Sequence, residues 1–355
     1  MKKILISTGG TGGHVIPAQV ISEHLKDNFE IIFTTDARGL RYLKVEKKNI
    51  KVIDTPKLNI DFFLIIKILK LFYLTLRSFF FLKKESIYKV ISTGGYMSLP
   101  LCIAAKLNGI KVYLLEPNLT LGRANKFFLN FSEKIFCYSN SLKNFPNNFL
   151  NKIEVIKPLV DKNFYEIKKN IYSSKKNFCI LIFGGSQGAS IFNTEIKEAI
   201  VALNKDYPIK VIQQTNIENI ENLRNFYNLN KIENRIFNFE KDFIKLIDES
   251  DLCISRAGAT SLAEISIMNK PFITIPLPSA KDNHQMNNAE FYEKAGCCWI
   301  LDQKDSNYKN FLSLLLKILK DKSDYNNKKK NLEKLNYQNL WNDINLKLNK
   351  IINEN

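Results

Sequence analysis

The chain has 355 residues, of which 45% are hydrophobic and 25% are charged, a composition typical of a globular protein large enough for two domains. Its formal net charge of +17 favours anionic partners, although a general enrichment in Lys, Asn and Ile explains the charge equally well. The six cysteines show no metal-like spacing and no RNP-type aromatic motif is present, so we expect reduced cysteines of a cytosolic protein, no metal and no nucleic acid.

The first half of the chain alternates short β-branched runs with longer helical patterns such as Val15–Lys26 and Leu99–Leu107. The first apolar run is too short for a signal peptide, so we predict a strand there. The alternation is that of βαβ units and predicts a mostly parallel sheet. The predicted strands are Ile4–Ser7, Glu30–Thr34, Lys51–Asp54, Lys89–Ser92, Lys111–Leu115 and Lys134–Cys137.

The segment Ile60–Leu82 is apolar and long enough to suggest a membrane span. Lys67, Lys70 and Arg77 interrupt it, and charges deep in a bilayer are costly. We therefore predict an interfacial helix with its apolar face in lipid and its basic residues near head groups. The alternative is a buried crossover helix of the first domain.

After a polar stretch near Lys157–Lys176 the alternation begins again. Each half opens with an apolar strand that runs into a glycine-rich turn. We predict an α/β protein with two doubly wound, Rossmann-like domains facing each other across a cleft, at residues 1–157 and 158–340, followed by a C-terminal tail at 341–355. The strands predicted in the second half are Phe178–Phe183, Ile209–Gln213, Arg235–Asn238, Leu252–Ser255 and Phe272–Ile275.

Three glycine-rich loops follow predicted strands: Gly9–Gly13 with His14, Gly94–Tyr96, and Gly184–Gly188. Glycine lets the backbone turn tightly and approach a ligand, and a following helix offers free N–H groups to an anion. With Asp36 as a ribose-binding acid, the first loop alone is compatible with a dinucleotide-binding oxidoreductase. Three loops in two domains suit ligands that carry several phosphates better than one NAD.

The motif SRAGATSLAE at Ser255–Glu264 also follows a predicted strand. Gly258–Ser261 would begin a helix suited to phosphate, and Glu264 could accept both hydroxyls of a ribose. The alternative is an ordinary capping box, because Ser261 and Glu264 match S-x-x-E. The polar loop Pro276–Glu290 presents His284 and Gln285 either to sugar hydroxyls or to solvent.

Six motifs in this order resemble the MurG family, GT-B-fold enzymes of glycosyltransferase family 28. The resemblance covers nearly the whole chain. It implies inverting transfer of N-acetylglucosamine from UDP-N-acetylglucosamine to an undecaprenyl-linked muramyl-pentapeptide in peptidoglycan synthesis, without a cofactor, at the anionic cytoplasmic face of the bacterial inner membrane. The motifs are GGTGGHVIPA at Gly9–Ala18, STGGYMSLP at Ser92–Pro100, EPNLTLGRANK at Glu116–Lys126, GGSQGA at Gly184–Ala189, SRAGATSLAEI at Ser255–Ile265 and KDNHQMNNA at Lys281–Ala289.

The same resemblance implies a role for individual residues. In the first domain, Thr11, Gly12 and Gly13 would contact the donor sugar and the acceptor diphosphate, and Asn118 would contact the donor N-acetylglucosamine. We propose His14 as the base that takes the acceptor's hydroxyl proton, because an imidazole titrates near neutral pH; the alternative is a helix-start residue that only holds the loop.

In the second domain the resemblance implies a nucleotide site. Ser186 would bind the UDP phosphates, Glu264 the ribose and Gln285 the sugar, while the loop with Glu240 would read uracil through its backbone. The remaining residues that would line the nucleotide are Ala259, Thr260, Ser261, Leu262 and Ala263.

Two positions depart from the family pattern. Leu115 replaces a histidine before Glu116, and Val160 stands where the family has a nucleotide-site arginine. Lys157 could compensate in part. The alternatives that stay open are a diacylglycerol glycosyltransferase of the same fold, a Rossmann oxidoreductase, and a nucleotide-binding module without catalysis.

Overall fold

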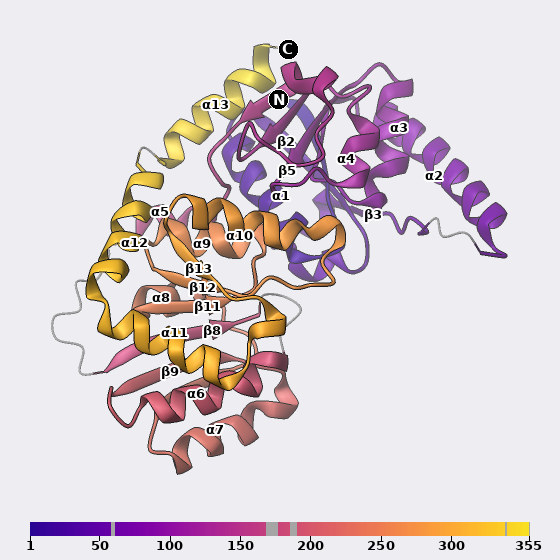
Figure 1. Ribbon diagram of the computed structural model, residues 1–355. Helices are drawn as coiled ribbons and strands as arrows, with labels where there is room; N and C mark the ends of the chain where they lie inside the picture. The colour runs from indigo at the N-terminus through magenta and orange to yellow at the C-terminus, as the bar shows by residue number, and fades with distance from the viewer. Residues whose placement is uncertain (58–60, 168–176, 185–189, 338, 355) are drawn as a thin grey trace. The chain divides into compact units, whose positions relative to one another are not determined.

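The structure is a computed structural model that describes residues 1–57, 61–167, 177–184, 190–337 and 339–354. Contacts within the chain divide it into two units (Figure 1). The first unit comprises Met1–Asp161 together with Leu340–Asn355, and the second comprises Lys162–Asn339. The segment that the sequence set apart as a tail therefore packs with the first unit.

The first unit is built on a parallel sheet in the order β3-β2-β1-β4-β5-β6-β7. A strand that is covered on both faces has a nearly continuous apolar sequence, as the runs KILI and KVYLLE do here. The strands are β1 (Lys2–Ser7), β2 (Phe29–Thr35), β3 (Ile50–Val52), β4 (Ile87–Ser92), β5 (Lys111–Glu116), β6 (Lys134–Cys137) and β7 (Ile153–Val155). The strand order reverses between β1 and β4, where Ser7 lies beside Ser92, so the loops after these two strands leave the sheet together.

Helices cover this sheet, and their apolar faces complete its core (Figure 1). The helices are α1 (Gly12–Leu25), α2 (Leu64–Lys84), α3 (Leu99–Leu107), α4 (Arg123–Phe128) and α13 (Trp341–Glu354). Helix α2 packs against α3 through one side. None of the helices in the described part of the chain combines the length and low charge that crossing a bilayer requires.

Helix α13 is anchored to the first unit by its two ends. The Trp341 ring stacks on His24 of α1 with centroids 3.7 Å apart. At the other end, the buried Lys89 ammonium of β4 donates to the carbonyl of Ile352. A cation at a helix C-terminus meets the negative end of the helix dipole, which explains how a lysine can be buried in a sheet.

The second unit repeats the architecture with the strand order β10-β9-β8-β11-β12-β13. The strands are β8 (Phe178–Phe183), β9 (Ile209–Gln214), β10 (Glu233–Phe237), β11 (Leu252–Ser255), β12 (Phe272–Thr274) and β13 (Cys298–Ile300). The helices are α5 (Asn163–Glu166), α6 (Glu195–Leu203), α7 (Ile220–Leu229), α8 (Phe243–Glu249), α9 (Ala259–Ile267), α10 (His284–Lys294), α11 (Tyr308–Lys320) and α12 (Lys322–Leu335). Here the order reverses between β8 and β11, where Ser255 pairs with Phe183.

Two doubly wound parallel sheets with alternating helices confirm the predicted α/β fold class. Both reversal points lie at glycine-rich loops named from the sequence. Because ligands of such sheets bind outside the carboxyl ends of the strands at a reversal point, each unit has one expected binding edge.

Candidate functional site

The first glycine loop, Gly9–Gly13, is held by the carboxylate of Asp36 at the end of β2. One oxygen, Oδ1, accepts the backbone N–H groups of Gly10 and Gly39, each at 2.8 Å. The other, Oδ2, accepts from Nε and Nη2 of Arg38 at 3.0 and 2.8 Å. A Cβ on Gly9 would lie 2.8 Å from Oδ1, and Gly10 has a φ of +83°. Glycine is therefore required at both positions.

This use of Asp36 removes the basis for a dinucleotide-binding role. Both carboxylate oxygens are already paired within the protein, so neither is presented to a ribose. Burial by itself would raise the pKa of Asp36, but hydrogen bonds from Gly10, Gly39 and Arg38 outweigh it and hold the pKa below its usual value. Asp36 is an anchor of the loop.

Arg38 joins the first glycine loop to the second, Gly94–Tyr96. Its Nη2 donates to the hydroxyl of Tyr96 at 2.9 Å. Directly after β4 and β1, the hydroxyl of Thr93 donates to that of Thr8 at 2.8 Å. The two loops that leave the sheet at its reversal point are therefore fixed to each other by side chains.

His14 lies in the first turn of α1 and reaches Thr93, the residue that precedes the second glycine loop. Its Nδ1 is 2.7 Å from the carbonyl oxygen of Thr93. A carbonyl only accepts, so Nδ1 carries the proton when the ring is neutral, and Nε2 is then the basic nitrogen. The ring is half-buried, which fixes its orientation without removing it from solvent.

The N-terminus of α1 offers backbone donors at the same place. Thr11 is the N-cap residue with extended backbone, and the N–H groups of His14 and Val15 turn back to its carbonyl. Gly12 and Gly13 come before the first of these bonds, so their N–H groups have no partner in the helix. The predicted residues Thr11, Gly12, Gly13 and His14 are thus brought together at one helix start.

Asn118 is positioned by the buried carboxylate of Glu116 at the end of β5. The Oε1 atom accepts from the Asn118 backbone N–H and side-chain amide at 3.2 and 3.1 Å. The Oε2 atom accepts from Gly122 N–H at 2.8 Å and the Asn125 amide at 3.0 Å. Glu116 therefore shapes the whole turn from Pro117 to Gly122. The neighbouring departure, Leu115, is fully buried as a core residue.

In the second unit, β11 leads directly into α9. Gly258 is the N-cap, and the first intrahelical bond runs from Leu262 N–H to Gly258 carbonyl. The N–H groups of Ala259, Thr260 and Ser261 precede that bond and have no partner in the helix. The capping-box alternative is wrong, because Ser261 lies inside the first turn and no side chain caps the helix.

The residues of α9 that were predicted to line the nucleotide differ in how deeply they are buried. Thr260, Ser261 and Glu264 are half-buried, whereas Leu262 and Ala263 are buried. Within this group the Thr260 hydroxyl is buried and has no hydrogen-bond partner among the described residues, and Leu262 is fully buried. Ser186, in the third glycine loop, lies outside the described residues; its neighbour Gly184 donates its N–H to Oε1 of Gln214 at 3.3 Å.

Two further polar residues, Arg256 and Gln285, lie on the segments that follow β11 and β12. Arg256 donates to the carbonyl of Ile275 at 3.0 Å and stacks over the Phe192 ring, and its half-buried position lowers its pKa. Gln285, at the start of α10, accepts Leu277 N–H at 2.9 Å through its carbonyl oxygen, so its amide N–H groups are the donors that it can offer. Sequence reasoning passed over Arg256, although its place inside the SRAGATSLAE motif was a signal.

Glu240 belongs to the turn between β10 and α8. Its carboxylate pairs with Arg235 and accepts Asp242 N–H at 3.1 Å. The Glu240 side chain is thus engaged within the turn. Val160 is buried in the first unit and supplies no charge.

Comparison with known proteins identifies the family. Residues 4–137 match the glycosyltransferase family 28 N-terminal domain, and residues 179–342 match its C-terminal domain. The chain is 48% identical over 355 residues to the UDP-N-acetylglucosamine--N-acetylmuramyl-(pentapeptide) pyrophosphoryl-undecaprenol N-acetylglucosamine transferase of Pelagibacter ubique, covering 100% of this chain and 99% of that one. The chain belongs to glycosyltransferase family 28.

Two further comparisons agree with this result, one in sequence and one in fold. The transferase of the same name from Rickettsia bellii is 34% identical over 344 residues, covering 94% of this chain and 95% of that one. The crystal structure of Acinetobacter baumannii MurG superposes with a TM-score of 0.78 at 23% identity, covering 99% of this chain and 100% of that chain. The family 28 protein is therefore a glycosyltransferase, and the oxidoreductase alternative is wrong.

Proposed function

We propose that this family 28 protein transfers N-acetylglucosamine from UDP-N-acetylglucosamine to N-acetylmuramyl-(pentapeptide) pyrophosphoryl-undecaprenol. The observation that carries the proposal is 48% identity over the full chain to a transferase named for this reaction. The site geometry supports it, because each sheet ends in helix starts with open N–H groups, which suit the diphosphates of the two substrates.

The donor is proposed to bind at the edge of the second unit. The open N–H groups of Ala259–Ser261, together with Ser186 of the third loop, would hold the diphosphate. Glu264, farther along α9, would accept the ribose hydroxyls, and Gln285 would donate its amide to the sugar. The turn around Glu240 would contact uracil through backbone groups.

The reaction is a single inverting displacement at the anomeric carbon. The acceptor's 4-hydroxyl attacks while UDP departs, so negative charge develops on the diphosphate. Fixed N–H donors at a helix N-terminus stabilise that charge without reorganising, which lowers the barrier. Arg256 lies close to the same helix start and would strengthen the local positive potential, in place of the cation that Val160 does not provide.

His14 is the proposed base in the first unit. Its hydrogen bond to the Thr93 carbonyl at 2.7 Å leaves Nε2 to receive the hydroxyl proton. Gly12 and Gly13 would bind the acceptor diphosphate through their open N–H groups, next to Thr11. Asn118, fixed by Glu116, would contact the donor N-acetylglucosamine.

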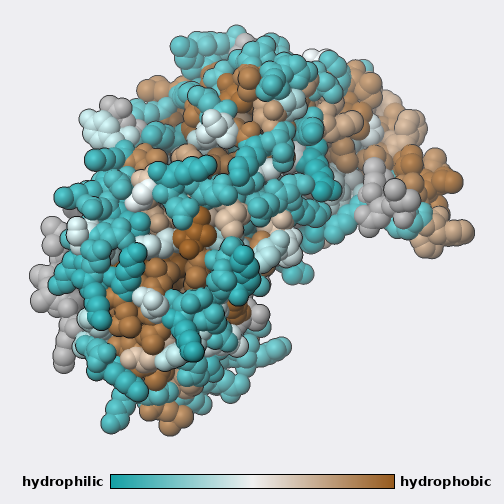
Figure 2. All heavy atoms as spheres, in the orientation of Figure 1, coloured by the Kyte–Doolittle hydropathy of each residue, from teal (hydrophilic) through white to brown (hydrophobic). Residues whose placement is uncertain are grey.

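The protein is proposed to act as a peripheral protein on the anionic cytoplasmic face of the bacterial inner membrane, docked through α2. One side of α2 is buried against the first unit, as is usual for a crossover helix; its buried residues are Leu74, Thr75, Ser78 and Leu82. Its other side is apolar and exposed, and Figure 2 shows the hydrophobic side chains gathered at this end of the first unit. We call this surface the docking face; its residues are Phe62, Phe63, Ile65, Ile66, Ile68, Leu69, Phe72, Tyr73, Leu76 and Phe80.

Contiguous exposed apolar side chains of this kind mark a membrane or protein contact. Lys70, Arg77, Lys83 and Lys84 border the docking face and are exposed, which favours an anionic lipid surface. The buried side of α2 agrees with the crossover-helix alternative, and its exposed apolar side supports the proposed interfacial role.

The test of the reaction compares two acceptors. Purified protein is incubated with radiolabelled UDP-N-acetylglucosamine and vesicles that contain either the undecaprenyl-linked muramyl-pentapeptide or diacylglycerol. The proposal predicts label only in the first lipid. Label in diacylglycerol would instead favour the diacylglycerol glycosyltransferase.

A further inference from the structure

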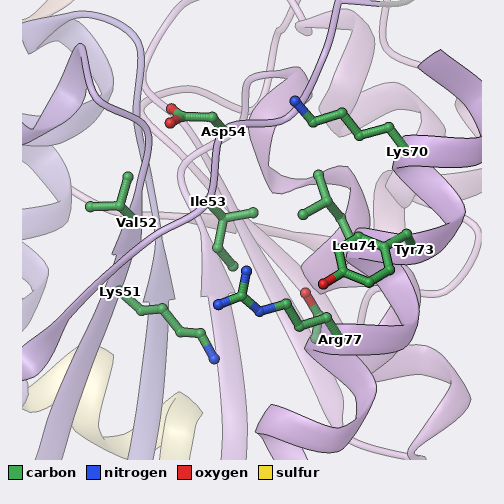
Figure 3. A pocket seen from close by; sticks show the side chains of 9 residues that line it. Lys51, Val52, Ile53, Asp54, Lys70, Tyr73, Leu74 and Arg77 are labelled. Atoms are coloured by element: carbon green, nitrogen blue, oxygen red, sulfur yellow. The ribbon is translucent and has the colours of Figure 1, made fainter. Parts of the chain in front are cut away.

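The segment that follows β2 is pressed against the first glycine loop. A Cβ on Gly39 would lie only 2.8 Å from the Cα of Gly9, so a residue with a side chain could not take this position without moving the loop. Ala37 donates its N–H at 3.0 Å to Oδ1 of Asp54, which lies just beyond the end of β3 (Figure 3). The backbone is therefore held on both sides of the residue between them, Arg38.

Arg38 uses only part of its guanidinium inside the protein. Of the five N–H donors of an arginine, that of Nε is donated to Asp36, and the two of Nη2 are donated to Asp36 and Tyr96. Among the residues that the structure describes, Nη1 has no hydrogen-bond partner. The side chain is 51% exposed. Because the guanidinium is planar and rigid, the three internal bonds also fix the direction of the two remaining donors.

These two donors lie near the start of α1. The Nη2 atom of Arg38 is 3.8 Å from the position that a Cβ on Gly10 would take, and α1 begins two residues later, at Gly12. There the N–H groups of Gly12 and Gly13 have no partner in the helix. Asp36 balances the charge of Arg38, so attraction for an anion comes from directed N–H groups and from the helix dipole. Such donors suit a group with several oxygens, as a phosphate has.

We propose that Arg38 is a binding residue for the acceptor, and that its Nη1 group donates to the diphosphate between the acceptor's sugar and its undecaprenyl chain. This inference rests on the proposed function, in which Gly12 and Gly13 bind that diphosphate. It adds a side chain from a neighbouring segment, held in position by Asp36 and Tyr96. Arg38 then contributes to specificity, because a lipid without phosphate, such as diacylglycerol, offers its Nη1 group no anionic partner.

The first test compares two substitutions that remove the same charge from the same segment. Arg38→Gln removes the proposed ligand. Arg41→Gln is the control, since Arg41 is exposed and forms no hydrogen bond or ion pair within the described ranges. The KM for the lipid acceptor is measured at saturating donor. Arg38→Gln should raise it on the order of tenfold or more through lost charge-assisted hydrogen bonds, and Arg41→Gln should change it little. Equal effects of the two variants would overturn the inference.

A third variant separates binding from a purely structural role. Arg38→Lys keeps a cation that can pair with Asp36 but lacks the planar fork that serves Asp36 and a phosphate at once. The melting temperature of Arg38→Lys should therefore lie closer to that of the unaltered protein than that of Arg38→Gln does, while its acceptor KM stays raised. A KM that returns to the unaltered value with lysine would show that Arg38 only holds Asp36.

Calorimetry with UDP-N-acetylglucosamine shows which diphosphate Arg38 reads. The Kd for this donor should be the same in the unaltered protein and in Arg38→Gln. A raised donor Kd with an unchanged acceptor KM would overturn the assignment to the acceptor. Absence of transfer by the unaltered protein would overturn the proposed function, whereas transfer with an unchanged acceptor KM in Arg38→Gln would overturn only the role of Arg38.

Discussion

We predict that His24 makes the attachment of helix α13 to α1 dependent on pH. The imidazole is buried against Trp341, and neither ring nitrogen has a hydrogen-bond partner among the described residues. Burial lowers its pKa from 6.5 to about 4. When α13 separates from α1, the ring regains water and its ordinary pKa, so the open form binds a proton that the closed form excludes.

The size of the stability change follows from the difference between the pKa values of His24 in the attached and the open form. Because the pKa of His24 is lower when α13 is attached to α1, the attached form has its full stability above about pH 6.5. It loses stability as the pH falls toward about 4. The complete loss is about 3 kcal/mol, and the loss already reached at pH 5 is about 2 kcal/mol. Opening of α13 should therefore be on the order of thirtyfold more frequent at pH 5 than at pH 7.

Hydrogen exchange of the α13 amides, corrected for the intrinsic pH dependence of exchange, measures this opening. His24→Phe keeps a ring for Trp341 to stack on but cannot bind a proton. The variant should exchange alike at pH 7 and pH 5, while the unaltered protein opens more at pH 5. The same pH dependence in both proteins would refute the reasoning.

Three further predictions concern the site and the docking face. Glu264→Ala should raise the Kd for UDP-N-acetylglucosamine about tenfold or more in calorimetry, through lost ribose hydrogen bonds; an unchanged Kd would place Glu264 outside the site. His14→Ala should lower kcat on the order of 10²–10⁴-fold with donor affinity retained, and a variant with most of its turnover would assign the proton transfer to another group. Replacing the exposed Ile65 and Phe72 with Ser should release a folded protein from anionic vesicles while sparing UDP binding; unchanged vesicle binding would contradict docking through α2. The partly buried Phe81 is a poor site for that test, since its loss would disturb the core.

The fold class and the binding edges could be predicted from local patterns. Apolar runs that end in glycine are visible in the sequence, and both reversal points of the sheets fall on such runs. Short elements were missed: β7 has three residues, Ile153–Val155, and too few positions to show a periodicity. Helix α13 was expected as a tail, because its packing depends on His24 and Lys89, which are remote in sequence.

The roles of single polar residues were harder to predict. An acid after the second strand has the same appearance whether it binds a ribose or its own backbone, and only the folded loops show that Asp36 holds Gly10 and Gly39. Ser261 and Glu264 likewise matched a capping box until the helix start was located at Ala259. The roles assigned to Thr11, Asn118, Ser186 and Gln285 stay predictions.

The central claim is the transfer of one N-acetylglucosamine to the lipid-linked acceptor. It is tested most directly by mass spectrometry of the lipid after incubation with UDP-N-acetylglucosamine, with released UDP measured in parallel. We predict that the muramyl-pentapeptide lipid gains one N-acetylhexosamine for each UDP released, and that His14→Ala forms little of this product. Release of UDP without any change in the mass of the lipid would contradict the account.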